Sequence, residues 1–349
     1  MHLLEVKNLR TSFFTPAGEV KAVDGVSFNL DEGKVLGIVG ESGSGKSVTS
    51  YSIMQILSEP GTILEGSSVK FRGEELVGAK EDALRKIRGN RISMIFQDPM
   101  TSLNPVYTIG NQLEEAILLH TQRSKTEAKA RAVELLGLVG INEPEKRVKQ
   151  YPYELSGGMR QRVMIAMALA CEPDILIADE PTTALDVTIQ AQILELMQEL
   201  QKKMGMAIIM ITHDLGVIAS MCDEVIVMYA GRVAERGTAP AIFYHPAHEY
   251  TKGLMRSIPS IDDDHKQKLI PIAGTPIDLL ALPKGCAFAP RCEKALKICL
   301  QEHPTEYWVG TDHISCCWLN VKKAMDEGWM EEGVDGGLPT LHFTKEDLA

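Results

Sequence analysis

Short, unbroken runs of apolar residues recur along the chain, and each is typical of a strand buried on both faces of a sheet. They include residues 35–39 (VLGIV), 175–178 (ILIA) and 208–212 (IIMIT). Other stretches place apolar residues at helical spacing, as at residues 109–120 (IGNQLEEAILLH) and 126–141 (TEAKARAVELLGLVGI). Such strands alternating with helices predict an α/β protein with a mostly parallel sheet.

A glycine-rich loop follows the first of these strands and precedes a helical pattern. The sequence matches G-x-x-x-x-G-K-S, with the residues Gly40, Glu41, Ser42, Gly43, Ser44, Gly45, Lys46 and Ser47. Glycines allow backbone N–H groups to turn toward phosphate oxygens, and the helix N-terminus adds partial positive charge. The lysine reaches the β- and γ-phosphates, and the serine hydroxyl ligates Mg²⁺. The loop predicts a binding site for a nucleoside triphosphate. The alternative is a glycine-rich turn that arose by chance.

Two adjacent acids end the strand at residues 175–178. Open α/β sheets bind ligands at the carboxyl ends of their strands, where Asp179 and Glu180 stand. Asp179 is suited to hold Mg²⁺ through water, and Glu180 to polarise the water that attacks the phosphate. The alternative is a solvated acidic turn.

Composition narrows the class of protein. The chain of 349 residues has room for a large and a smaller domain, and its formal charge of -11 argues against nucleic acid as the main partner. The N-terminus lacks the pattern of a secretory signal, and no apolar run reaches the roughly 18 residues of a membrane span. We expect a cytosolic protein whose clustered cysteines are metal ligands rather than disulfides.

Three further stretches indicate which kind of nucleotide enzyme this is. LSGGMRQR places Ser156, Gly157 and Gly158 ahead of an apolar helix, which makes a second anion-binding helix start. One nucleotide does not easily use both helix starts of one chain, so we expect the second to act on the nucleotide of another subunit. Gln97 and His213 each follow an apolar run.

The order of these motifs resembles the nucleotide-binding subunit of an ABC transporter. The resemblance implies that Gln97 contacts Mg²⁺ and the water, and that His213 lies on the γ-phosphate. It implies that Ser156, Gly157 and Gly158 reach the γ-phosphate of the opposite site, and that Asp186 lies at the dimer interface. Phe13 takes the place of the aromatic residue, usually tyrosine, that stacks on adenine. The implied fold is a P-loop cassette with an antiparallel β subdomain and a helical subdomain that carries Ser156.

Longer stretches resemble the oligopeptide/dipeptide/nickel importer ATPases, among them FQDPMTSLNPVYTIGNQL and IFYHPAHEYTKGLMRSIP. The resemblance implies a nucleotide-binding domain at residues 1–240, its helical subdomain at about 98–164, and a C-terminal extension at 241–320. Residues 321–349 are a polar tail without an assignment.

The implied function is ATP hydrolysis that drives a peptide importer. The implied partners are a second ATPase subunit (a paralogue or the chain itself), two transmembrane permease subunits and, indirectly, an extracytoplasmic peptide-binding protein. The expected location is the cytoplasmic face of the membrane. The alternatives are a nickel or small-solute importer ATPase, a free-standing ABC regulator and an iron–sulfur redox protein.

Cysteines gather near the C-terminus, with the spacing Cys286-x5-Cys292-x6-Cys299-x17-Cys317. The C-x-x-C arm of most zinc sites is absent, and wider spacing suits an iron–sulfur cluster. The segment resembles the C-x-FAPRC pattern on which members of the importer family carry a [4Fe–4S] cluster. That resemblance favours Cys317 over Cys316 as the last ligand. A zinc site and unliganded thiols are the alternatives.

Overall fold

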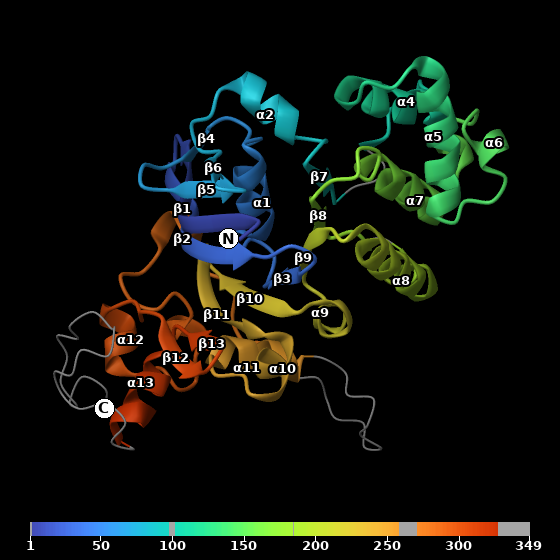
Figure 1. The fold of residues 1–349 in the computed structure, drawn as a ribbon. Helices are drawn as coiled ribbons and strands as arrows, with labels where there is room; N and C mark the ends of the chain where they lie inside the picture. The colour runs from blue at the N-terminus through green and yellow to red at the C-terminus, as the bar shows by residue number, and fades with distance from the viewer. Residues whose placement is uncertain (1, 98–101, 184, 258–270, 327–349) are drawn as a thin grey trace, which may run out of the picture.

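An eight-stranded sheet forms the centre of the protein, in a computed structural model that describes residues 2–97, 102–183, 185–257 and 271–326 (Figure 1). Its strands, in spatial order, are β12 (Tyr307–Gly310), β13 (His313–Ser315), β11 (Arg232–Thr238), β10 (Glu224–Tyr229), β3 (Val35–Val39), β9 (Ala207–Thr212), β8 (Ile175–Asp179) and β7 (Ile92–Ile95). The five strands from β10 to β7 are parallel, and β11, β13 and β12 add on antiparallel.

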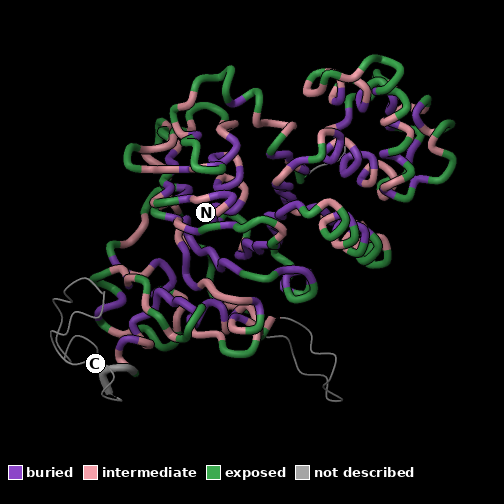
Figure 2. Tube along the Cα trace, in the orientation of Figure 1, coloured by how far each residue is buried: buried purple, intermediate pink, exposed green. Residues whose placement is uncertain are grey.

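The core lies on both faces of this sheet because successive side chains of a strand point to opposite sides. In β8, Leu176 and Ala178 belong to one buried cluster, and Ile175 and Ile177 belong to the other. All five residues of β8 are buried. Figure 2 shows buried positions running along the strands and exposed positions on the outer helices and loops. The predicted parallel core is therefore confirmed.

An antiparallel sheet, formed by the N-terminal part of the chain, packs against the core. It consists of β1 (Leu4–Thr15), β2 (Gly18–Leu30), β4 (Gly61–Ile63), β5 (Ser68–Phe71) and β6 (Glu74–Glu75). The helices α1 (Lys46–Met54) and α2 (Glu81–Ile87) come from the same part of the chain. Val6, Phe28 and Val69 of this sheet share a buried cluster with Ile38 of the central sheet.

A group of helices stands to one side of the sheets in Figure 1. It contains α4 (Ile109–His120), α5 (Lys125–Leu138), α6 (Pro144–Arg147), the short 3-10 turn η1 (Pro152–Glu154) and α7 (Gly157–Ala168). The start of α5 has a complete capping box: Ser124 accepts from the N–H of Glu127, whose carboxylate accepts from the N–H of Ser124. The long helix α8 (Val187–Met204) lies below this group in Figure 1, and α9 (Leu215–Met221) lies beside the central sheet.

The C-terminal part packs against β11 and lengthens the central sheet. It contains α10 (Ala239–Tyr244), α11 (Glu249–Arg256), η2 (Leu279–Ala281), η3 (Ala289–Arg291), α12 (Lys297–Gln301) and α13 (Trp318–Asp326). Its own buried cluster is small, with Ala289, Ile298, Cys299, Trp318 and Val321. The polar tail predicted from residue 321 lies almost wholly outside the described residues. No helix in the described part of the chain is both long enough and apolar enough to span a bilayer.

Candidate active site

The phosphate loop joins the end of β3 to the start of α1, as the sequence predicts. Gly43 and Gly45 have φ angles of 77° and 97°, a region that favours glycine. At Gly45 a Cβ atom would lie 2.3 Å from the carbonyl oxygen of Ala22, and at Gly40 one would lie 2.2 Å from that of Met228. The glycines are therefore required both by backbone conformation and by the close approach of neighbouring strands.

Lys46 points back over the loop. Its Nζ donates to the carbonyl oxygens of Gly40 (2.8 Å) and Glu41 (3.0 Å), and the side chain is buried. Burial lowers the pKa of Lys46, and the nearby acids Glu180, Asp179 and Glu41 oppose this shift. The ammonium thus stands at the mouth of the loop, among acids, where the predicted phosphates would lie.

Asp179 lies at the end of β8 and is fully buried. The Ser47 hydroxyl donates to its Oδ1 at 3.0 Å, while no described residue hydrogen-bonds its other oxygen, Oδ2. Burial raises the pKa of Asp179, the bond from Ser47 opposes this, and Glu180 adds to the rise. A buried, unpartnered carboxylate oxygen beside a serine hydroxyl fits the oxygen ligands that Mg²⁺ prefers.

Glu180 gathers the other predicted catalytic residues around its carboxylate. Gln97 Nε2 lies 3.0 Å from Oε2, and the His213 Nδ1 lies 3.2 Å from Oε1. The Thr183 hydroxyl also donates to Oε2, at 2.9 Å. Burial works against ionisation, but the hydrogen bonds from Thr183 and His213 hold the pKa of Glu180 below its ordinary value. The carboxylate is therefore ionised at neutral pH, which is the state that accepts a proton from water.

Sequence reasoning missed Thr183. It lies in a turn in which its own N–H donates to the carbonyl oxygen of Glu180 at 3.1 Å, so its hydroxyl is carried back to the carboxylate. A hydroxyl residue three positions after the acid was the available signal. The backbone of Glu180 also has a φ of 46°, which is uncommon for a residue with a side chain.

The second helix start is a true N-cap, but the structure does not join it to the loop of the same chain. The Ser156 hydroxyl accepts from the N–H of Met159, and Asp186 caps α8 in the same way through Ile189. Gly158 packs closely on Ile189, where a Cβ would lie 2.9 Å from its Cγ2. Within the ranges that the structure describes, no hydrogen bond links residues 156–158 to residues 40–47. The residue before Leu185, Ala184, lies outside those ranges.

Phe13 lies in β1, half-buried, with its ring over Gly61. Its cross-strand partner in β2 is Val20. A cavity of about 310 Å³ beside the phosphate loop is lined by Val20, loop residues 41–44 and residues 276–279 of the C-terminal part. Phe13 does not line this cavity, although its partner does, so its role in stacking on adenine stays a prediction.

Four of the C-terminal cysteines face a common space. Cys286, Cys292, Cys299 and Cys317 line one small cavity of about 10 Å³. Cys316 does not line it, although it is buried next to Cys317. Burial raises the pKa of Cys286 to about 11 and that of Cys317 to about 12. Across the described residues, however, no three His, Cys, Asp or Glu side chains form a group that could hold a metal ion. The structure therefore gathers the predicted thiols without forming a finished metal site.

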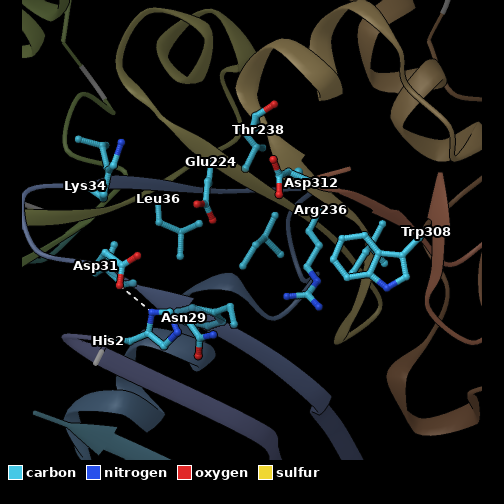
Figure 3. A pocket seen from close by; sticks show the side chains of 17 residues that line it. His2, Asn29, Asp31, Lys34, Leu36, Glu224, Arg236, Thr238, Trp308 and Asp312 are labelled. Carbon is cyan, nitrogen blue, oxygen red and sulfur yellow. Dashed lines mark hydrogen bonds and ion pairs between the residues drawn. The ribbon is translucent and has the colours of Figure 1, made fainter. Parts of the chain in front are cut away.

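A separate cavity of about 450 Å³ lies where β3 and β10 begin, at the other end of these strands from the phosphate loop (Figure 3). Charged side chains line it, with Asp31 hydrogen-bonded to His2 at 2.6 Å, and Arg236 and Trp308 on the side of the C-terminal part. No residue of the phosphate loop and neither acid at the end of β8 lines this cavity. It is therefore not part of the nucleotide site.

Comparison with known proteins agrees with this geometry. A model of the ABC transporter family matches residues 23–183, and a model of the oligopeptide/dipeptide transporter C-terminal region matches residues 234–299. The oligopeptide transport ATP-binding protein OppD of Bacillus subtilis is 56% identical over 317 residues, which are 91% of this chain and 88% of that protein. The dipeptide transport ATP-binding protein DppD of the same organism is 53% identical over 322 residues, 92% of this chain and 96% of that protein.

Solved structures give the same result for the fold. A dimeric structure of the ATP-binding cassette MJ0796, bound to ADP and Pi, has a TM-score of 0.61 and 29% identity. The match covers 68% of this chain and 98% of that one, and the predicted cassette fold is thereby confirmed. The chain belongs to the ABC transporter ATPases, as an ATP-hydrolysing cassette followed by the oligopeptide/dipeptide transporter C-terminal region.

Proposed function

We propose that this ATPase drives the import of peptides through a membrane permease. The observation that carries the proposal is the match of residues 234–299 to the oligopeptide/dipeptide transporter C-terminal region. The names of the OppD and DppD relatives support it, because the resemblance extends over about nine-tenths of this chain. The nickel or small-solute importer predicted as an alternative shares the cassette and differs in cargo.

The proposed chemistry uses the side chains gathered at the ends of the core strands. The loop amides and Lys46 bind the phosphates, and Ser47 and Asp179 would hold Mg²⁺, with Gln97 nearby. Bound Mg²⁺ neutralises charge that develops on the transferred phosphate. Glu180 accepts a proton from the attacking water, with its carboxylate oriented by Gln97, His213 and Thr183.

A second ATPase subunit completes each site in this proposal. Ser156, Gly157 and Gly158 begin α7 away from their own phosphate loop, so they are available to a nucleotide held by a partner. Asp186 caps the neighbouring helix α8 and would lie at the same interface. The MJ0796 cassette, which resembles this chain in fold, was solved as a dimer.

The helical group supports docking to a permease at the cytoplasmic face of the membrane. Several large apolar side chains in and before it are exposed: Val106 (71%), Tyr107 (53%), Leu119 (75%) and Tyr153 (66%). Exposed large apolar side chains on one helical group are consistent with a surface that contacts another protein. We further propose domain boundaries at residues 1–240 and 241–320, with the helical subdomain at about 98–164 and residues 321–349 without an assignment.

The cargo is tested in proteoliposomes that contain the chain, its permease subunits and its binding protein. ATP-dependent accumulation of a labelled tripeptide is expected, and the Glu180→Gln chain should give none. Nickel is supplied in a parallel assay. Uptake of nickel without uptake of peptide would contradict the proposed cargo and leave the ATPase assignment intact.

We also propose that Cys286, Cys292, Cys299 and Cys317 hold a [4Fe–4S] cluster. The support is that all four line one cavity and that their sequence spacing lacks the C-x-x-C arm of most zinc sites. Metal ligation would ionise thiols whose pKa burial raises. The cluster would supply a structural clamp for a segment with a small apolar core.

Elemental analysis of anaerobically prepared protein tests the cluster. We expect about four irons per chain and visible thiolate-to-iron absorbance, both lost in Cys317→Ser. Cys316→Ser is the matched control and should keep its iron, because Cys316 does not line the cavity. Stoichiometric zinc without iron would replace the cluster with a zinc site, and loss of iron with Cys316 alone would overturn the choice of Cys317.

A further inference from the structure

Glu41, the second residue of the phosphate loop, is held through all three of its polar groups. Its N–H donates to the Tyr250 hydroxyl at 2.8 Å, and its carbonyl oxygen accepts from Lys46 Nζ at 3.0 Å. Its carboxylate takes two hydrogen bonds from the guanidinium of Arg291, at 2.5 and 3.0 Å. Tyr250 and Arg291 both belong to the C-terminal part. That part therefore holds Glu41, the residue whose carbonyl oxygen also binds Lys46.

Arg291 is built into this position rather than resting on the surface. Its side chain is only 5% exposed. Besides the bonds to Glu41, its Nε donates to the carbonyl oxygen of Ala273 at 3.0 Å, and Nη2 donates to that of Ile272 at 3.3 Å. A guanidinium that is nearly buried, bidentate to a carboxylate and further hydrogen-bonded is held in one geometry.

An aromatic cluster packs both Tyr250 and Arg291 against the core sheet. The Tyr250 ring, which is fully buried, lies 4.7 Å from that of Tyr229 at the end of β10 and 5.3 Å from that of Phe288. The Arg291 guanidinium lies over the rings of Tyr229 (5.8 Å) and Phe288 (5.9 Å). The contact to Glu41 is therefore backed by rigid packing, not by a loop alone.

We propose that Arg291 and Tyr250 are positioning residues for ATP binding, acting through Glu41. A loop with three glycines loses much conformational freedom when its amides converge on phosphates. By fixing Glu41 before ATP arrives, the C-terminal part removes some of that loss and holds the carbonyl oxygen from which Lys46 turns to the phosphates. The proposal rests on the ATPase assignment and depends on neither the cargo nor the cluster.

The test compares two arginines that each pair with a glutamate across the same junction. Arg291→Ala should raise the Kd of the full chain for Mg·ATP about tenfold, within the range usual for coupling between two sites. Arg236 pairs with Glu306 at 3.0 Å and lines the separate cavity of Figure 3, which no residue of the phosphate loop lines. Arg236→Ala should leave the Kd within about twofold of the wild-type value, since it breaks a junction pair that no loop residue shares. Iron content is measured in every variant so that loss of metal is not mistaken for loss of the contact.

Tyr250→Phe keeps the buried ring and removes only the hydroxyl that accepts from Glu41, so it tests the proposal even if Arg291→Ala fails to fold. We expect a rise in Kd of roughly threefold, together with a small fall in melting temperature because the Glu41 N–H loses its acceptor. Because coupling is reciprocal, ATP should also slow hydrogen exchange at residues 286–292 of the wild type and not of Arg291→Ala.

A double-variant cycle shows whether the effect of Arg291 passes through Glu41. Arg291→Ala in a Glu41→Gln background should change the Kd less than it does in the wild type. An unchanged Kd in both Arg291→Ala and Tyr250→Phe would overturn the proposal. An equal rise in Arg236→Ala and Arg291→Ala would also overturn it, since it would show a general loss of structure.

Discussion

The nucleotide site and the cysteine segment reach order in different ways. At the nucleotide site the functional side chains already bind one another: Ser47 donates to Asp179, and Gln97 and His213 contact Glu180. The cysteine thiols share a cavity, yet they form no group that could hold a metal among the residues described. At the first site the side chains of this chain already contact one another, whereas at the second site the thiols only line a common cavity.

The difference follows from the size of the buried core that supports each region. β3, β8 and β9 are buried along their whole length, so the residues after them are fixed by a large core. The cysteine segment has a buried cluster of five residues of its own, and its buried residues Ala287 and Phe288 join the main core. It also contacts β11, α11 and the phosphate loop. A small apolar core rarely stabilises such a segment alone, which is why docking and metal matter more there.

The largest expected effect lies at the nucleotide site. Glu180→Gln keeps the shape of the side chain and removes the charge that accepts a proton, so kcat for ATP hydrolysis should fall roughly 10²- to 10⁴-fold. ATP binding should persist, because Lys46 and the loop are unchanged. Steady-state hydrolysis and ATP titration separate the two. Glu195→Gln on α8 is the matched control, and near-normal turnover by Glu180→Gln would refute the assignment.

The sequence predicted the parts of this site that depend on local pattern. The strand at residues 35–39, the helix at 109–120 and the loop between β3 and α1 lie where periodicity and the glycine motif placed them. Gln97 and His213 both contact the carboxylate of Glu180, whereas the contacts with Mg²⁺ and the γ-phosphate that the resemblance implies stay predictions. Their strands are neighbours in a parallel sheet, and that order could be inferred only from the fold of the family.

Contacts between distant parts of the chain could not be predicted in this way. Arg291 and Glu41 are 250 residues apart, and neither shows in its local sequence that it has a charged partner. β12 and β13 are short, and their residues lack the apolar run of a central strand, yet they extend the core sheet. Such pairings are decided by tertiary packing, which overrides local preference.

The second prediction tests whether the helix start at Ser156 acts on the nucleotide of a partner subunit, apart from the phosphate loop of its own chain. Ser156→Arg places a bulky cation where a partner's nucleotide is proposed to bind, so hydrolysis by the assembled transporter should fall at least about tenfold. The isolated chain should still bind ATP. Ser124→Arg also removes an N-cap from a helix of the same group and is the matched control, because Ser124 has no place in the proposed site. Equal losses in both variants would point to damage of the helical group.

The last prediction concerns the stability of the C-terminal part at acidic pH, and it leaves the nucleotide site unchanged. Burial lowers the pKa of His248 to about 4, although Glu235 and Glu249 partly oppose this. Its Nδ1 accepts from the N–H of Tyr250 and so caps α11, a bond that protonation would remove. Because the folded pKa lies below the ordinary value, the unfolded chain binds more protons between about pH 6.5 and 4. Stability is full above that window and falls by about 3 kcal/mol as the pH drops through it.

His248→Asn isolates this effect, since asparagine is also a good N-cap and does not titrate. Of the three tryptophans of the chain, Trp308 and Trp318 lie in the described C-terminal part, and their fluorescence follows the unfolding of that part by denaturant. We expect the wild-type midpoint to fall from pH 7 to pH 4.5 more steeply than that of His248→Asn. The same substitution at the exposed His245 controls for the loss of a histidine as such. Parallel curves for the wild type and His248→Asn would contradict this prediction. They would show that protonation of His248 does not destabilise the C-terminal part and that its sensitivity to acid comes from other groups.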